Sequence, residues 1–208
     1  MSRVLAFQKI AGPAAVACVA FLLSAGAAGE ASGAPASARA ASPRTVTAAL
    51  ITRTPGSLRR GTIVRSAALG VRVFPDARHG FALASVAQGE YPATTTNGGG
   101  TWRINGPVLH VDAAQAPLAV LDVGAVSRST YFACCGAQVI DITSDGGKHW
   151  WQSLFSGLVM AVVSRGDGRL IAFTQGQASG SGVQAINRVY VSTDGGRHWH
   201  PDDRIGAF

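Results

Sequence analysis

The carboxylates of this chain are the first residues to test for chemistry, because glycoside hydrolysis is performed by a pair of acids. The 208 residues contain only two glutamates, Glu30 and Glu90. Glu90 stands next to Tyr91, but neighbours on a strand point to opposite faces of a sheet, so these two cannot act as a pair there. An aspartate partner for Glu90 stays open. We therefore expect no catalytic residues, with glycoside hydrolysis as the alternative.

The histidines suggest a second chemistry, metal binding. His198 and His200 are two residues apart, so they share one face of a strand, which Asp202 extends. A zinc site needs three or four ligands, and no partner at a suitable spacing completes this set. His149 and His198 each precede a tryptophan at the same place in a repeated motif, which indicates a hairpin role. The sequence therefore predicts no metal and no other cofactor.

Two adjacent cysteines, Cys134 and Cys135, are candidates for redox chemistry. On a regular strand their side chains point to opposite faces, so a disulfide between them would need a strained backbone. We expect one buried and one exposed thiol, with redox function and pairing between molecules as alternatives.

Three copies of one octapeptide, at 95–102, 143–150 and 192–199, indicate the structural elements that position these residues. The copies start 48 and 49 residues apart, and a fixed period of this length marks a repeat architecture. In each copy Asp or Asn before two glycines fits a tight hairpin, and the closing tryptophan buries a large apolar area. The positions with these structural roles are Thr95, Asn97, Gly99, Trp102, Thr143, Asp145, Gly147, Trp150, Ser192, Asp194, Gly196 and Trp199.

Aligning the chain on the octapeptides predicts three four-stranded units, at about 62–107, 108–156 and 157–203. Pro92 marks the third strand of the first unit as edge-like or irregular. The expected strands are 70–74, 80–85, 91–95, 101–105, 119–123, 130–134, 138–143, 149–153, 159–164, 170–175, 188–192 and 198–200.

The octapeptides resemble Asp-boxes, the repeat (also called BNR) of sialidase-like β-propellers. Segment 74–83, where a Phe, a polar turn, a Gly and an aromatic precede small residues, resembles blade openings of photosystem II stability and assembly factors. The resemblance implies an all-β, propeller-like fold with the octapeptides as peripheral hairpins, in which Asp145 and Asp194 are structural and Asn97 departs to an amide. The sialidase site of that family needs an arginine triad, a Tyr–Glu pair and an Asp, which Glu90 alone does not supply.

Three blades are few, because closed propellers have four to eight. We therefore expect a partial or small propeller. Strands at 45–52 and 62–66 could supply part of a fourth blade, but an open arc is the preferred interpretation. Open blade edges would favour self-association.

The N-terminus predicts export. Residues 1–27 resemble a signal peptide: basic residues, an apolar run at 10–23 that is short for a membrane span, and a small-residue cleavage site. Residues 28–60 form an Ala/Ser/Arg-rich linker with a leading strand, and 61–208 the repeat domain. The protein is expected to be secreted or associated with the cell envelope, with anchoring by an uncleaved leader as the alternative.

Positive charge is concentrated near the start of the domain. Residues 39–78 carry eight arginines and one acid, Asp76, in a chain whose net charge is +7. This segment is expected to contact anionic cell-envelope polymers, with a solvated tether as the alternative. Export and the lack of a binding motif argue against nucleic acid. The sequence thus predicts an exported, non-enzymatic module that binds a protein or glycan, or assists assembly.

Overall fold

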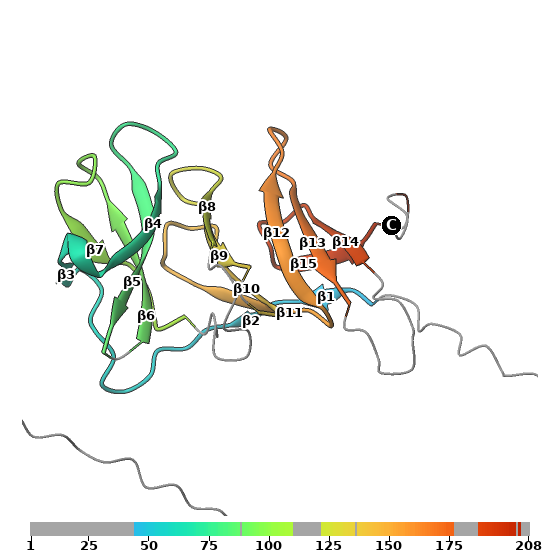
Figure 1. Ribbon diagram of the computed structural model, residues 1–208, viewed down its shortest axis with the longest axis horizontal. Helices are drawn as coiled ribbons and strands as arrows, with labels where there is room; N and C mark the ends of the chain where they lie inside the picture. The colour runs from blue at the N-terminus through green and yellow to red at the C-terminus, as the bar shows by residue number, and fades with distance from the viewer. Residues whose placement is uncertain are drawn as a thin grey trace, which may run out of the picture. The chain divides into compact units, whose positions relative to one another are not determined.

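The computed structural model describes residues 44–87, 89–109, 122–135, 137–176, 187–202 and 204. In these ranges the chain forms fifteen β-strands and one short 3₁₀ helix (Figure 1). The predicted signal peptide, the linker up to residue 43 and residues 177–186 lie outside the described residues. The elements are β1 (Val46–Thr47), β2 (Ala49–Leu50), β3 (Ile63–Val64), η1 (Ser66–Ala68), β4 (Leu69–Val73), β5 (Gly80–Val86), β6 (Gly89–Thr95), β7 (Trp102–Ile104), β8 (Asp122–Ala125), β9 (Tyr131–Cys134), β10 (Val139–Thr143), β11 (Trp151–Leu154), β12 (Leu158–Ser164), β13 (Leu170–Gln175), β14 (Asn187–Ser192) and β15 (His198–Pro201).

The strands form three antiparallel sheets of five strands each, which we name in chain order. The first sheet has the order β3-β7-β6-β5-β4, the second β2-β11-β10-β9-β8 and the third β1-β15-β14-β13-β12. In each sheet four consecutive strands form a meander, and a fifth strand comes from the start of the described chain. The prediction of an all-β chain with three repeated four-stranded units is confirmed, and each unit has one strand more than expected.

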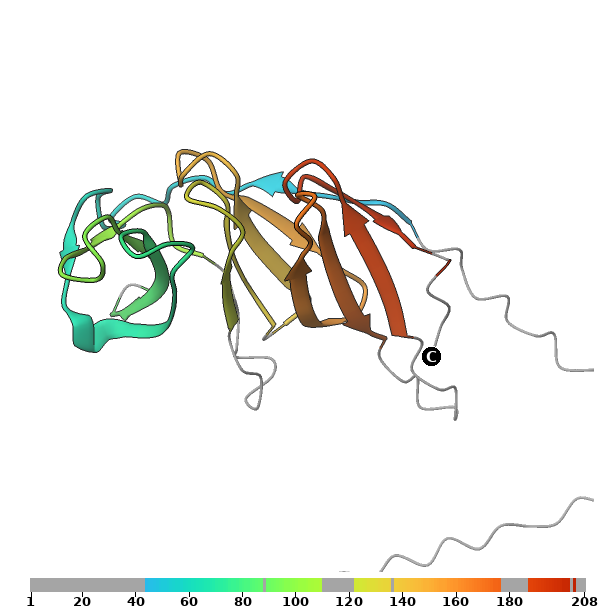
Figure 2. The same ribbon diagram turned by 90° about the horizontal axis from the view of Figure 1, so that it is seen from above.

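The fifth strands belong to one stretch of chain, residues 45–64, which we call the N-terminal strap. It pairs first with β15 of the third sheet, then with β11 of the second and last with β7 of the first (Figures 1 and 2). Each partner is the last strand of its meander, whose outer edge would otherwise leave backbone groups unpaired. These strands therefore do not build part of a fourth unit, because their pairing is divided among three sheets.

The cores lie within and between neighbouring sheets. One cluster belongs to the first sheet and contains Tyr91 and Trp102. A second cluster joins the first sheet to the second through Phe81 and Trp150, and a third joins the second sheet to the third. Within the described residues no cluster joins the first sheet to the third. Middle strands such as β5 and β10 consequently have continuous buried runs, because both faces of the sheet are covered.

Pro92 does not make β6 an edge strand, so the edge-like part of that expectation is wrong. β6 pairs with β5 on one side and with β7 on the other. The residues of β6 that pair with β7 are Ala93 and Thr94. Pro92 precedes these paired residues, so its lack of an N–H group does not interrupt the pairing. The Pro92 carbonyl accepts a hydrogen bond from the Asn105 amide at 2.7 Å.

The described residues include no helix with the length and apolar character of a membrane span.

Candidate functional site

The three octapeptides share one hydrogen-bonded turn. The leading hydroxyl donates to the side-chain oxygen of the Asn or Asp two residues later, at 2.8, 3.0 and 2.9 Å in the three copies. The same hydroxyl accepts the amide of the second glycine, at 3.0, 2.9 and 2.9 Å. The Asn or Asp oxygen accepts the amide four residues later, at 2.9, 3.0 and 3.0 Å. Asn97 makes the same bonds as the two aspartates, so the turn needs an acceptor oxygen rather than a charge.

The second glycine of the second octapeptide is required by both conformation and space. Gly147 has a φ of 84°, in the left-handed region that favours glycine. A Cβ at this position would collide with the backbone oxygen and side chain of Asn105, which belongs to the first sheet's closing segment. The second octapeptide therefore lies against the preceding sheet, and the close approach depends on glycine.

The closing tryptophans extend this docking into the core. Trp150 donates its Nε1 hydrogen to the Asn105 carbonyl at 3.0 Å, and Trp199 donates to the Ser153 hydroxyl at 3.0 Å. Both acceptors stand three residues after the tryptophan of the preceding octapeptide. Trp102 has no preceding sheet in the described chain, and its buried Nε1 has no hydrogen-bond partner there. The ring of Phe74 lies against it instead, edge-on at 5.8 Å between centroids.

The two octapeptide aspartates, Asp145 and Asp194, have lowered pKa values and are ionised at neutral pH. Partial burial raises the pKa of Asp145, but hydrogen bonds from the backbone and ring of His149 and from Thr143 outweigh it and lower the pKa to about 2. The corresponding bonds from His198 and Ser192 lower the pKa of Asp194 to about 2 as well. Neither carboxyl group holds a proton near neutral pH, so neither can serve as a general acid there.

The histidines that suggested a metal are engaged in separate contacts. His149 and His198 each place Nδ1 2.6 Å from the carboxylate of their own octapeptide. His200 lies on β15, with its Nδ1 3.3 Å from the hydroxyl of Thr45 on the N-terminal strap. Among the residues that the structure describes, no three His, Cys, Asp or Glu side chains gather closely enough to hold a metal ion.

Glu90 and Tyr91 lead to different partners. The Glu90 carboxylate accepts a hydrogen bond from the Ser85 hydroxyl at 2.9 Å on the adjacent strand. Tyr91 is fully buried, and its hydroxyl accepts the Leu58 amide of the N-terminal strap at 3.1 Å. The structure therefore separates the two groups, as strand alternation predicts.

The expectation of two free thiols is wrong, because Cys134 and Cys135 form a disulfide with each other. Cys134 ends β9 and is fully buried, whereas Cys135 has already left the strand. The φ of Cys135 is 73°, in the left-handed region, so the second side chain turns back toward the first instead of alternating to the other face. The expectation assumed a regular strand through both residues, and the chain departs from it at the second.

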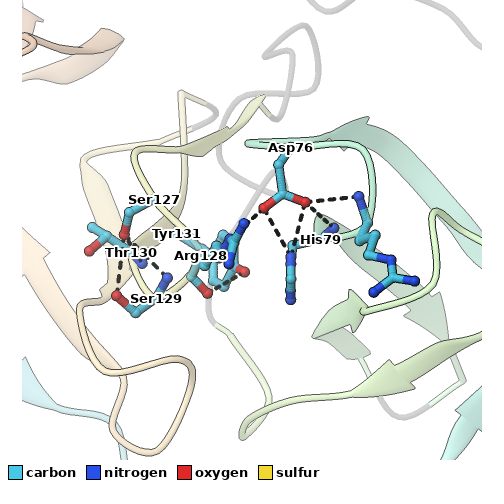
Figure 3. A network of polar contacts seen from close by, with 8 residues as sticks. Asp76, His79, Ser127, Arg128, Ser129, Thr130 and Tyr131 are labelled. Atoms are coloured by element: carbon cyan, nitrogen blue, oxygen red, sulfur yellow. Dashed lines mark hydrogen bonds and ion pairs between the residues drawn. The ribbon is translucent and has the colours of Figure 1, made fainter.

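An unpredicted polar network joins the first two sheets (Figure 3). Asp76, in the turn between β4 and β5, accepts the amides of Arg78 and His79, each at 2.8 Å. Arg128, in the turn between β8 and β9, donates to its other oxygen at 2.6 Å, and Tyr131 donates to the Arg128 carbonyl at 2.6 Å. The only sequence signal was an isolated acid in a basic segment, because the partner lies 52 residues away.

Asp76 and Tyr131 have pKa values displaced away from neutral pH in opposite directions. Hydrogen bonds from the backbone of His79 and then of Arg78 hold the pKa of Asp76 well below its usual range. Burial, and secondly the Asp76 charge, raises the pKa of Tyr131. The ionised Asp76 carboxylate holds the two turns together through its ion pair with Arg128. This carboxylate carries no proton that it could give to a substrate at neutral pH.

Comparison of the chain with models of known protein families gave no match, and a search among curated proteins gave none either. The likeness of the octapeptides to Asp-boxes consequently rests on their residues and enters below as a proposal.

Proposed function

We propose that this chain is an exported, non-enzymatic, β-propeller-like module of the Asp-box kind, which binds a protein or glycan or assists assembly. The observation that carries the proposal is the common geometry of the octapeptides. Their hydroxyl and carboxylate or amide oxygens are used to close turns, and their tryptophans are buried in the cores. Residues used in this way build a scaffold, and scaffolds of this type present variable loops for recognition.

The rival function is glycoside hydrolysis of the sialidase type, and a fluorogenic sialoside separates the two. We expect no turnover above the enzyme-free blank. Turnover that disappears in Glu90→Gln would overturn the non-enzymatic proposal, because Glu90 is the only glutamate in the described chain. Ser85→Ala, which removes the hydrogen-bond donor to Glu90 but keeps the carboxylate, is the matched control.

Export is tested separately by fractionating cells that produce the full chain and sequencing the N-terminus of the product. The proposal expects a chain outside the cytoplasm that begins near residue 28. An intact leader on membrane-bound protein would favour the anchored alternative, and an intact chain in the cytoplasm would contradict export.

We also propose that the first sheet's free end is covered by the third sheet of a second copy. The Trp102 Nε1 group, which has no hydrogen-bond partner in the described chain, supports this contact. Trp150 and Trp199 each donate to the residue that stands three positions after the tryptophan of the preceding octapeptide. On the third sheet that position is Asp202, a half-buried carboxylate that is an apt acceptor. Docking would displace the exposed ring of Phe74.

Light scattering tests this association across a range of protein concentrations. The proposal expects a species of at least two copies that is weakened by Asp202→Ala, whereas Asp167→Ala, in the hairpin between β12 and β13, leaves it unchanged. A monomer at every concentration would overturn the proposed contact without affecting the proposed binding function.

A further inference from the structure

A cavity of about 280 Å³ lies where the N-terminal strap passes over the junction of the first and second sheets. Its basic wall consists of Arg53 and Arg60 from the strap and Lys148 and His149 from the second octapeptide. Ile51 and Pro107 are among its apolar residues, with the buried Trp150 beside them. Two segments that are distant in sequence thus bring four basic side chains to one cavity.

The two arginines are held in place without being neutralised. Arg53 donates from Nε to the Ser57 hydroxyl at 3.2 Å and from Nη2 to the Leu58 carbonyl at 2.5 Å, and Arg60 donates from Nη2 to the Gly146 carbonyl at 3.0 Å. A carbonyl orients a guanidinium but carries no net charge to balance it. In the described part of the chain, no carboxylate forms an ion pair with Arg53, Arg60 or Lys148.

The remaining basic group is arranged differently. His149 places Nδ1 2.6 Å from the Asp145 carboxylate, so its Nε2 is the nitrogen left to meet a ligand. The Asp145 oxygens are themselves occupied by the turn amide and this ring. The cavity therefore concentrates three permanent positive charges, and their mutual repulsion is relieved when an anion enters.

We propose that this cavity binds a phosphate group carried on a polyol or sugar unit. Guanidinium groups match phosphate oxygens with paired donors, and a lysine ammonium adds a point charge, so three cations suit a phosphate better than a single carboxylate. The apolar wall accommodates the carbon skeleton. The volume lies at the small end of ligand sites, which corresponds to one phosphorylated unit rather than a large cofactor. That the unit belongs to an anionic polymer of the cell envelope rests on the proposed export.

Titration calorimetry on the full-length protein, with glycerol 3-phosphate as the probe, tests the site. Neutral glycerol is the negative probe, and inorganic phosphate and phosphatidylglycerol vesicles identify the source of the phosphate. We expect glycerol 3-phosphate to bind with an affinity that falls as salt rises, and Lys148→Gln to weaken it about tenfold. The Lys148 side chain makes no hydrogen bond or ion pair in the described structure, so this variant should fold normally.

The matched control is Arg165→Gln, which removes one exposed charge from the hairpin between β12 and β13. An equal loss in both variants would overturn the proposal, because it would show attraction to overall charge rather than to a site. Binding of vesicles alone, or of no phosphate probe, would overturn it as well. Export of a chain that fails to bind would refute only this inference, whereas binding by a chain retained in the cytoplasm would refute only the proposed export.

Discussion

Replacing Trp150 by phenylalanine and comparing the loss with that of Trp102→Phe tests the docking of each sheet on its predecessor. Both indoles are almost fully buried, so the two substitutions remove similar apolar area. They differ in the Nε1 hydrogen, which in Trp150 is donated to the Asn105 carbonyl at 3.0 Å and in Trp102 has no partner among the described residues.

The difference between the variants isolates the hydrogen bond. In Trp150→Phe a bond worth about 1 kcal/mol is lost and a buried carbonyl loses its donor, a further penalty of about 1–3 kcal/mol. In Trp102→Phe, compared in an Asp202→Ala background that removes the proposed contact with a second copy, the group that disappears is already unpaired, so no such loss occurs. We therefore expect Trp150→Phe to be more destabilising than Trp102→Phe by about 2–4 kcal/mol. For a chain of this size that is a difference of roughly 4–16 °C in melting temperature.

The assay is urea unfolding followed by circular dichroism, because tryptophan fluorescence would change with the substitution itself. Trp199→Phe is an internal standard, since this indole donates to Ser153 of the neighbouring sheet at 3.0 Å, and also to the Gly196 carbonyl of its own octapeptide at 3.0 Å. It should resemble Trp150→Phe. If Trp102→Phe costs as much as the other two, the Nε1 bonds do not contribute to sheet docking and the reasoning fails.

Three further predictions follow from individual contacts. The folded-state pKa of Asp145, about 2, lies below its ordinary value of 3.8, so its stabilising contribution is complete above about pH 5 and is lost as the pH falls toward 2. In thermal melts, the melting temperature of Asp145→Asn should therefore fall less steeply with decreasing pH than that of the wild type, and an equally steep fall would contradict this. Alkylation of denatured, unreduced protein should leave Cys134 and Cys135 unlabelled until a reductant is added, and labelling of either beforehand would disprove the disulfide. Asp76→Ala should lower the melting temperature more than Arg128→Gln, because it removes the acceptor of two turn amides as well as an exposed ion pair; equal shifts would show that the turn bonds contribute nothing.

Local elements were predicted well because their causes are local. The strand expected at 170–175 is β13, and most other expected strands differ from the observed ones by one or two residues. The hydroxyl, the acceptor oxygen and the paired glycines of each octapeptide specify the turn within eight residues. Such patterns operate through bonds between near neighbours, which sequence spacing displays directly.

Contacts between distant segments could not be predicted in this way. The Cys134–Cys135 disulfide depends on the left-handed backbone conformation of Cys135, which the alternation of residues along a strand does not predict. The Asp76–Arg128 pair joins turns of different sheets, although neither side chain has a distinctive motif. The basic cavity likewise required Arg60 and Lys148 to meet across 88 positions of chain.

The residue pattern is sufficient to predict an all-β chain of three repeated units, with hairpins closed by their own side chains. The way these units are joined depends on contacts between distant parts of the chain. Thr47 and Ala49 are two residues apart, yet they pair with different sheets, and Val64 pairs with a third. The physical reason is that each meander leaves one open edge whose backbone groups need partners. Any extended segment can supply the backbone hydrogen bonds that such an edge needs, so the side chains of the strap do not indicate which strand each part of it pairs with.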